Sequence, residues 1–352
     1  MDSGIQPSGR VQDLWFEDGN LVIQAGTSQF RVYRGILAAR SPVFLDMLSF
    51  PQPADSELVD GCPVVRLPDA ELEVSEFLKA LFLPEYFPAF PYSTKFETLV
   101  GCLRLSHKYE VGFLRRRALV HLSSGHRTTL SDWDSSLSYY AAAQLKATAP
   151  ASAISDITSW PKPTTPQYSI CAIELAREVD ALWVLPAAFY RLSSNITATQ
   201  WALSNPAPEK ATYLGRPTTF SAQDRKALLS GHQTQLTSSA VDILRFLTDP
   251  LEIEGCLSPA RCTKQRLQAV DGSRDMLEQY PAIPLDIWEE ADWKLLDNVC
   301  SVCLPVLRRT HRAARQTFWD GLPSLFALPP WEDLERMKTA AIGDNVLFLG
   351  SP

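Results

Sequence analysis

The chain has 352 residues, enough for two or three domains, because one hydrophobic core typically serves roughly 100–200 residues. Its composition, 45% hydrophobic and 21% charged, is that of a globular protein and argues against disorder along the whole chain. The net charge of −7 argues against a chain that wraps nucleic acid along its full length, so basic clusters have to be weighed one by one.

Targeting and membrane segments are not predicted. The first ten residues, MDSGIQPSGR, lack the basic segment and the apolar run of roughly 7–15 residues that define a secretion signal. No stretch approaches the about 20 apolar residues that span a bilayer. We therefore expect a cytoplasmic or nuclear protein, in which the seven cysteines are mostly thiols or metal ligands.

Near the start of the chain, short alternating runs predict a hairpin, a third strand and two helices. Residues 14–17 and 20–24 flank Asp18-Gly19, a pair typical of a two-residue type I′ turn. Residues 29–33 alternate apolar and polar side chains, as a half-buried strand does. Ser41-Pro42, a capping serine with proline at the first helical position, then predicts the start of the second helix.

Several motifs in the first third of the chain occur together in one known domain. In chain order they are Phe30-x-Val32, Leu37, Ser41-Pro-Val-Phe44 and Met47-Leu48. The pattern continues through residues 64–69, 72–82, 96–111 and 114–122. In this order the motifs resemble a BTB/POZ domain, with the departure that Tyr33 stands where many relatives carry histidine.

The resemblance implies an α+β fold for residues 11–125, in which helices cap a small β-sheet. It also implies homodimerisation and, in some members, recruitment of a cullin-type ubiquitin ligase scaffold. The family's cullin contact often uses a hydrophobic residue, any residue and then glutamate after the third helix, and Leu83-Pro84-Glu85 fits that pattern. Leu83 and Glu85 are therefore candidate partner-binding residues. The surrounding loop, residues 83–94, is rich in aromatic residues, which favours a packed arm over a docking surface.

The rest of the chain is predicted to be mainly α-helical, in three regions. Residues 126–166 form a polar, proline-rich linker with a short helix at 137–145. Residues 167–250 form a helical extension of the kind that follows many BTB domains, with a break at Pro186 and with Ser221 as a helix cap. Residues 251–335 form a helical module that contains cysteines and tryptophans.

Four cysteines in this last module form the clearest candidate site. Cys256 and Cys262 are separated by five residues, and Cys300 and Cys303 by two. Two pairs of thiolates are what a tetrahedral structural zinc site needs, because each pair closes a small chelate and the ion joins distant segments. We expect Cys300 and Cys303 to share one face of a helix, with His311 as a substitute ligand.

Two other interpretations of the four cysteines stay open. The five-residue spacing exceeds the usual roughly two to four, and buried cysteines pack as small hydrophobes without a metal. A redox Cys-x-x-Cys is the third, without the βαβ pattern that accompanies it in thioredoxins. The segment is also similar to the C-terminal regions of fungal BTB proteins, in which paired cysteines precede Trp319-x-x-Leu-Pro and Leu-Pro-Pro-Trp331 motifs, a similarity that implies no activity.

Aromatic and basic residues surround the cysteines. We expect a satellite core built from Trp288, Trp293, Trp319 and Trp331. A basic helical face, formed by Arg308, Arg309, Arg312 and Arg315, is the best candidate for nucleic-acid contact, yet no DNA-binding motif accompanies it, and a solvated face is favoured. A solvated face is likewise expected for Arg115-Arg116-Arg117.

Catalytic motifs are missing from the sequence. It contains no phosphate-binding glycine loop, no His-Glu-x-x-His and no Gly-x-Ser-x-Gly, and its five histidines are scattered. We therefore predict no enzyme and no catalytic residue. The prediction is an adaptor that self-associates or docks proteins through its BTB-like domain, with a nuclear transcription or chromatin regulator as the alternative.

Overall fold

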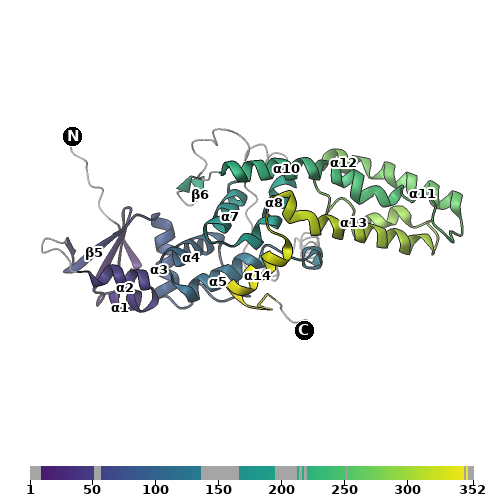
Figure 1. Ribbon diagram of the computed structural model, residues 1–352. Coiled ribbons are helices and arrows are strands. Elements are labelled where there is room, and N and C mark those ends of the chain that lie inside the picture. Colours follow the sequence, from purple (N-terminus) through teal and green to yellow (C-terminus); the bar gives the residue numbers. More distant parts are fainter. Residues whose placement is uncertain are drawn as a thin grey trace.

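A computed structural model describes residues 9–50, 57–135, 166–194, 212–213, 216–217, 220–250, 252–344 and 346–347. These residues form a mixed α/β structure of elongated shape (Figure 1). A β-sheet with its covering helices lies at one end, and a helical arm lies at the other. The helix predicted at 137–145 falls outside the described residues.

The sheet has five strands in the order β1-β3-β2-β5-β4. The strands are β1 (Gly9–Trp15), β2 (Leu21–Ala25), β3 (Ser28–Val32), β4 (Leu58–Val59) and β5 (Cys62–Leu67). Strands β2 and β3 pair antiparallel and carry the most buried side chains, whereas β2 pairs with β5, and β1 with β3, in parallel. The sheet therefore combines both strand directions around a buried central pair.

The predicted hairpin across Asp18-Gly19 is wrong, because β1 pairs with β3 and not with β2. The tight turn instead joins β2 to β3 at Gly26, whose φ of +56° is the positive value that glycine tolerates. Gly19 serves a different purpose: a Cβ there would lie 3.0 Å from the Arg31 Cγ atom. A glycine at this position therefore permits close approach to β3.

Five helices cover the sheet and one another. They are α1 (Arg34–Arg40), α2 (Pro42–Ser49), α3 (Glu71–Phe82), α4 (Phe96–Lys108) and α5 (Gly112–Ser124). Ser41 caps α2 as predicted, since its Oγ atom accepts a bond of 3.0 Å from the Phe44 amide. The same hydroxyl donates to the Tyr109 carbonyl oxygen, so the cap also joins α2 to the end of α4.

The helical extension begins with α7 (Pro166–Glu178), η2 (Leu182–Val184) and α8 (Leu185–Ser194). The helical path is interrupted at Asp180, which has a φ of +59°, and not at the predicted Pro186. Pro186 lies in the first turn of α8, where a helix tolerates proline because the amide has no intrahelical acceptor.

The remaining elements build the arm and the return to the centre of the molecule (Figure 1). They are β6 (Thr212–Tyr213), β7 (Arg216–Pro217), α10 (Ala222–Ser238), η3 (Ser239–Ile243), η4 (Leu244–Leu247), α11 (Pro259–Gly272), α12 (Arg274–Gln279), η5 (Glu290–Leu296), α13 (Cys303–Leu325) and α14 (Trp331–Ile342). Ser221 caps α10 as predicted, and its Oγ atom accepts from the Asp224 amide at 3.0 Å. Of the helices in these ranges, none combines the length and apolar character that crossing a membrane requires.

A partly buried ion network joins the sheet unit to the extension. Arg104 on α4 pairs with Glu73 on α3, and its Nε atom donates to the Glu178 carboxylate of α7 at 2.7 Å. The Arg104 and Glu73 side chains are 8% and 1% exposed. Because an uncompensated buried charge is costly, the Arg104–Glu73 pair holds α3 against α4, whereas the link to α7 is made by Glu178, whose side chain is 41% exposed.

The arginine run on α5 is only in part the solvated face predicted from the sequence, because Arg116 is exposed whereas Arg115 and Arg117 are half-buried. Arg115 donates to the Val179 carbonyl oxygen at 3.0 Å, Arg116 to that of Ile342 at 2.6 Å and Arg117 to that of Phe87 at 2.7 Å. Each guanidinium group therefore satisfies a backbone carbonyl from a different segment of the chain. Consecutive helical residues point in different directions, so one short run can serve three interfaces.

Candidate metal centre

The four cysteines come from two loop–helix units at the tip of the arm. Cys256 lies in the loop before α11, and Cys262 lies in the first turn of that helix. Cys300 lies in the turn before α13, and Cys303 is the first residue of that helix. The prediction that Cys300 and Cys303 share a helix face is therefore wrong, because the helix begins only at the second of them.

The sulfur atoms converge as the sequence predicts. All four Sγ atoms lie within 4.8 Å of one another, and those of Cys256 and Cys300 are 3.9 Å apart. A tetrahedral ion with metal–sulfur bonds of about 2.3 Å sets its ligands about 3.8 Å apart. The cluster could therefore bind a metal ion, whereas none of the seven cysteines is in a disulfide.

A glycine shapes the first of the two loops. Gly255 has a φ of +76°, and the Cys256 amide donates to the Ile253 carbonyl oxygen at 3.1 Å, which closes a tight turn. A side chain at position 255 would be strained in that conformation. The sequence signal for this turn is the glycine directly before Cys256.

Backbone amides favour the thiolate form of Cys300. The pKa of Cys300 is lowered to about 6, first by the Leu257 backbone N–H group and against the opposing effect of burial. The pKa values of Cys262 and Cys303 are raised, in both cases first by burial. The Cys300 amide in turn donates to the Cys262 Sγ atom at 3.3 Å. Such amides stabilise charged sulfurs whether or not an ion is present.

His311 is placed elsewhere and is not a fifth donor of the cluster. Its ring lies 5.0 Å from the Phe246 ring and 5.6 Å from the Trp293 ring, between centroids. Burial, reinforced by Arg315 and Arg308, lowers its pKa to about 3. His311 is therefore a neutral core residue, and its predicted role as a substitute ligand is not supported by its position.

Arg266 is a positioning residue that sequence reasoning missed. It is 3% exposed and donates to the Leu247 carbonyl oxygen at 2.9 Å and to that of Pro250 at 2.6 Å. These bonds tie α11 to the segment that leads into the Cys256 loop. In the sequence this arginine looks like any solvated residue between two cysteines, because no local pattern shows that its acceptors are some twenty residues away.

The tryptophans form two clusters instead of one satellite core. Trp288 and Trp293 pack edge to face at 5.6 Å, beside Phe246 and close to the cysteine-bearing helices. Trp319 and Trp331 stack at 5.4 Å in the part of the molecule where α14 returns. Each cluster therefore stabilises a different junction of the arm.

The predicted basic face on α13 is largely neutralised. Arg308 forms a two-bond pair with Glu290 and lies over the Trp293 ring at 4.5 Å. Arg315 forms a two-bond pair with Asp134. Of the four, Arg309 and Arg312 are exposed, whereas Arg308 and Arg315 are half-buried. The face thus lacks the continuous positive charge that binds phosphates.

The candidate partner-binding residues lie in a different part of the molecule, directly after α3. Leu83 is half-buried and Glu85 is exposed. The loop behind them is anchored by Phe87, which is fully buried, while Tyr92 farther along is 71% exposed. The loop at residues 83–94 is therefore packed against the sheet unit, as its composition favours, and is exposed around Tyr92.

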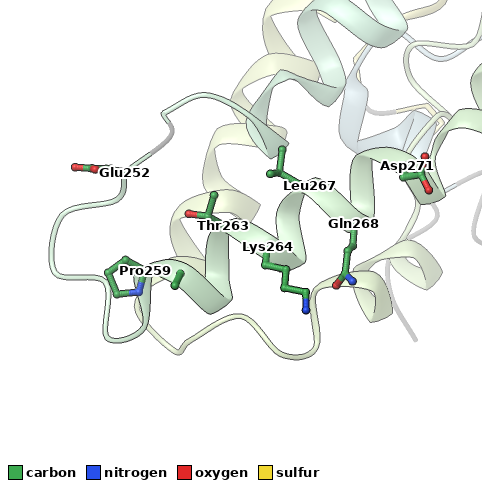
Figure 2. A pocket seen from close by; sticks show the side chains of 8 residues that line it. Glu252, Pro259, Thr263, Lys264, Leu267, Gln268 and Asp271 are labelled. Atoms are coloured by element: carbon green, nitrogen blue, oxygen red, sulfur yellow. The ribbon is translucent and has the colours of Figure 1, made fainter.

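An open groove of about 780 Å³ follows the outer face of α11 (Figure 2). Thr263, Lys264 and Leu267 line it from the helix. Glu252 lies across from them on the loop that leads to Cys256, and Figure 2 shows this loop standing away from the helix. The loop that supplies the first cysteine thus has one side open to solvent.

The chain was compared with family models, curated proteins and solved structures. No family model, no curated protein and no solved structure matches the chain. The BTB/POZ resemblance therefore remains a prediction from sequence motifs, and function has to be inferred from the residues and their arrangement.

Proposed function

We propose that the protein is a non-enzymatic adaptor, which self-associates through a BTB/POZ-like N-terminal unit and presents a helical arm to other proteins. The observation that carries this proposal is the set of apolar side chains exposed on the outer helices of that unit. Ile36 on α1, Leu45 on α2 and Phe50 directly after α2 are 40%, 53% and 69% exposed. An apolar surface of this kind is typical of an association site.

A second copy of the chain is the occupant that we propose for this surface. Helices α1 and α2 pack against each other, so their outer side chains belong to one rigid element. In a two-fold dimer the same patch meets itself, and apolar residues such as Leu45 satisfy both sides without a need for charge complementarity. The homodimerisation that the BTB/POZ resemblance implies fits the same surface.

Light scattering after gel filtration tests the dimer. The unmodified chain should have the mass of two copies at micromolar concentration, and Leu45→Glu should shift it to one copy, because the substitution buries a charge in the interface. Leu229→Glu is the matched control, since Leu229 lies on α10 and is 46% exposed. A single-copy mass for the unmodified chain would refute self-association.

We extend the adaptor proposal to a cullin-type scaffold, with Leu83 and Glu85 as contact residues. Glu85 is exposed and directly follows α3, so its carboxylate is free to meet a partner. A pull-down from native extract should enrich a cullin, and Leu83→Ala with Glu85→Lys should abolish the enrichment. Glu252→Lys is the control, because that exposed glutamate lies on the arm. A pull-down that enriches other proteins but no cullin would support a scaffold function without a ubiquitin ligase.

We also propose that the four cysteines hold one structural zinc ion. Four soft sulfur donors within 4.8 Å of one another fit zinc, and a closed four-cysteine site leaves no position open for substrate. The ion would join the start of α11 to the start of α13. It supplies a cross-link and no reaction.

Metal analysis of protein purified without added metal tests the zinc site. We expect about one equivalent of zinc per chain. Cys300→Ser should abolish it, whereas Cys171→Ser should not, because Cys171 is a buried cysteine on α7, outside the cluster. Zinc below about a tenth of an equivalent in the unmodified protein would show that the four cysteines pack together without a metal ion.

A further inference from the structure

One sulfur of the cluster differs from the other three in its access to solvent. Cys256 is half-buried, whereas Cys262, Cys300 and Cys303 are buried. Of the four cysteines, Cys256 is therefore the residue most accessible to small solutes in the surrounding water. Reactivity of cysteine depends on both thiolate character and access, and a metal-bound sulfur is a thiolate by definition.

The same sulfur also lies on the more movable side of the cluster. Cys262 and Cys303 lie within the first turns of the helices α11 and α13. Cys256 and Cys300 lie in the preceding loop and turn. Ile253 is the buried anchor of the Cys256 loop, and Leu257 on the other side of the cysteine is 68% exposed. The loop also stands away from α11 (Figure 2).

We propose that Cys256 and Cys300 are a peroxide-sensitive pair, which hydrogen peroxide converts to a disulfide. The inference rests on the proposed zinc site, in which both residues are ligands. Their sulfurs are already 3.9 Å apart, and a disulfide bond is about 2.05 Å long. The loop therefore has to move by only about 2 Å, and the two helices can stay in place.

The reaction needs no group beyond the two thiolates and the oxidant. The Cys256 thiolate attacks one peroxide oxygen, the O–O bond breaks, hydroxide leaves, and a sulfenic acid forms on Cys256. The Cys300 thiolate then attacks that sulfur and displaces hydroxide, which forms the disulfide. Two thiolates lose two electrons, peroxide gains them, and two protons from solvent convert both hydroxides to water.

Disulfide formation removes half of the ligands. Cys262 and Cys303 then remain, and two sulfurs do not satisfy an ion that requires four donors. We therefore expect the zinc to leave, so that the ion no longer links Cys262 to Cys303 and only the disulfide joins the segments that precede α11 and α13. Peroxide would thus loosen the tip of the arm, and a thiol reductant with zinc would restore it.

The test uses the full-length, zinc-loaded protein with hydrogen peroxide as the probe. A chromophoric chelator reports released zinc, and mass spectrometry of unreduced peptides identifies the disulfide. We expect about one zinc ion released per equivalent of peroxide, together with a peptide linked through Cys256 and Cys300. A reductant should reverse both signals.

Two variants sharpen the result. Cys256→His keeps a zinc ligand but removes the outer thiol, so peroxide-dependent release should slow by about tenfold or more. Cys171→Ser should release zinc at the unmodified rate. If Cys256→His fails to load zinc, the disulfide mapping on the unmodified protein decides the question by itself.

The outcomes separate this inference from the zinc site. Zinc that is present and then retained under peroxide overturns the inference alone, as does a disulfide between Cys300 and Cys303. Zinc below about a tenth of an equivalent before peroxide is added overturns the metal site and this inference with it. Linked Cys256–Cys300 peptides with matched zinc release establish it.

Discussion

At the scale of single residues, His311 shows how burial decides chemistry. The side chain is 6% exposed and lies against the rings of Phe246 and Trp293. Arg315 and Arg308 add positive charge nearby, so a proton on the imidazole would be both desolvated and repelled. A histidine that is neutral in the folded protein and protonated in the unfolded chain links stability to pH.

We predict that His311→Phe removes part of the acid sensitivity of folding. The folded pKa of about 3 lies below the unfolded value of about 6.5, so the unfolded state binds more protons between these values. Stability is therefore full above pH about 6.5 and falls by about 1.4 kcal/mol per pH unit below it. Denaturant unfolding at pH 7 and pH 5 measures this slope, which should be shallower in His311→Phe.

The control for this prediction is the same substitution at His107, which is half-buried and accepts from the Arg115 Nε atom. Protonation of the cysteines at low pH affects all three proteins equally and cancels in the comparison. An equal slope for the unmodified protein and His311→Phe would show that His311 gains a proton in the folded state.

At the scale of elements, the arm tip is a place where a metal can substitute for a hydrophobic core. The two loop–helix units meet through four sulfurs, while the loop before α11 buries Ile253 and leaves Leu257 exposed. So little apolar burial contributes little free energy to the folding of the loop. The binding free energy of an ion can supply the remainder, as it does in small zinc-dependent folds.

We predict that a chelator loosens the tip and leaves the sheet intact. Amide hydrogen exchange at residues 253–262 and 300–306 should accelerate by about tenfold or more, which corresponds to about 1.4 kcal/mol of local opening. Amides of β2 and α4 should keep their protection, because their side chains belong to the sheet core. Equal amide exchange rates at the tip before and after chelation would mean that packing alone holds the cysteines together.

Helix caps, which have local causes, could be predicted from the sequence, and so could the convergence of the two cysteine pairs, whereas strand pairing could not. The caps at Ser41 and Ser221 were correct because a capping hydroxyl bonds an amide three residues away. The hairpin was wrong because Asp18-Gly19 describes a turn, whereas the choice of β3 as the partner of β1 depends on the whole sheet. The five-residue cysteine spacing is explained by the position of Cys262, one turn inside α11.

At the scale of the whole molecule, the C-terminal helix packs against helices from the middle of the chain. Helix α14 contacts α5 and η2, and Arg116 on α5 donates to the Ile342 carbonyl oxygen at 2.6 Å. Trp331 at the start of α14 donates to the Trp319 carbonyl oxygen at 2.8 Å. The boundaries predicted at residues 125 and 335 mark changes of composition, but these contacts cross both of them.

We predict that Leu334→Ala on α14 weakens α5, although the two helices are far apart in sequence. Leu334 is fully buried, so the substitution should cost about 2–5 kcal/mol through lost burial and a cavity. Because α14 packs on α5, hydrogen exchange of the α5 amides should accelerate together with that of α14. Glu332→Ala, at an exposed position of the same helix, should change neither. Faster exchange confined to α14 would show that α5 is stable without its C-terminal partner.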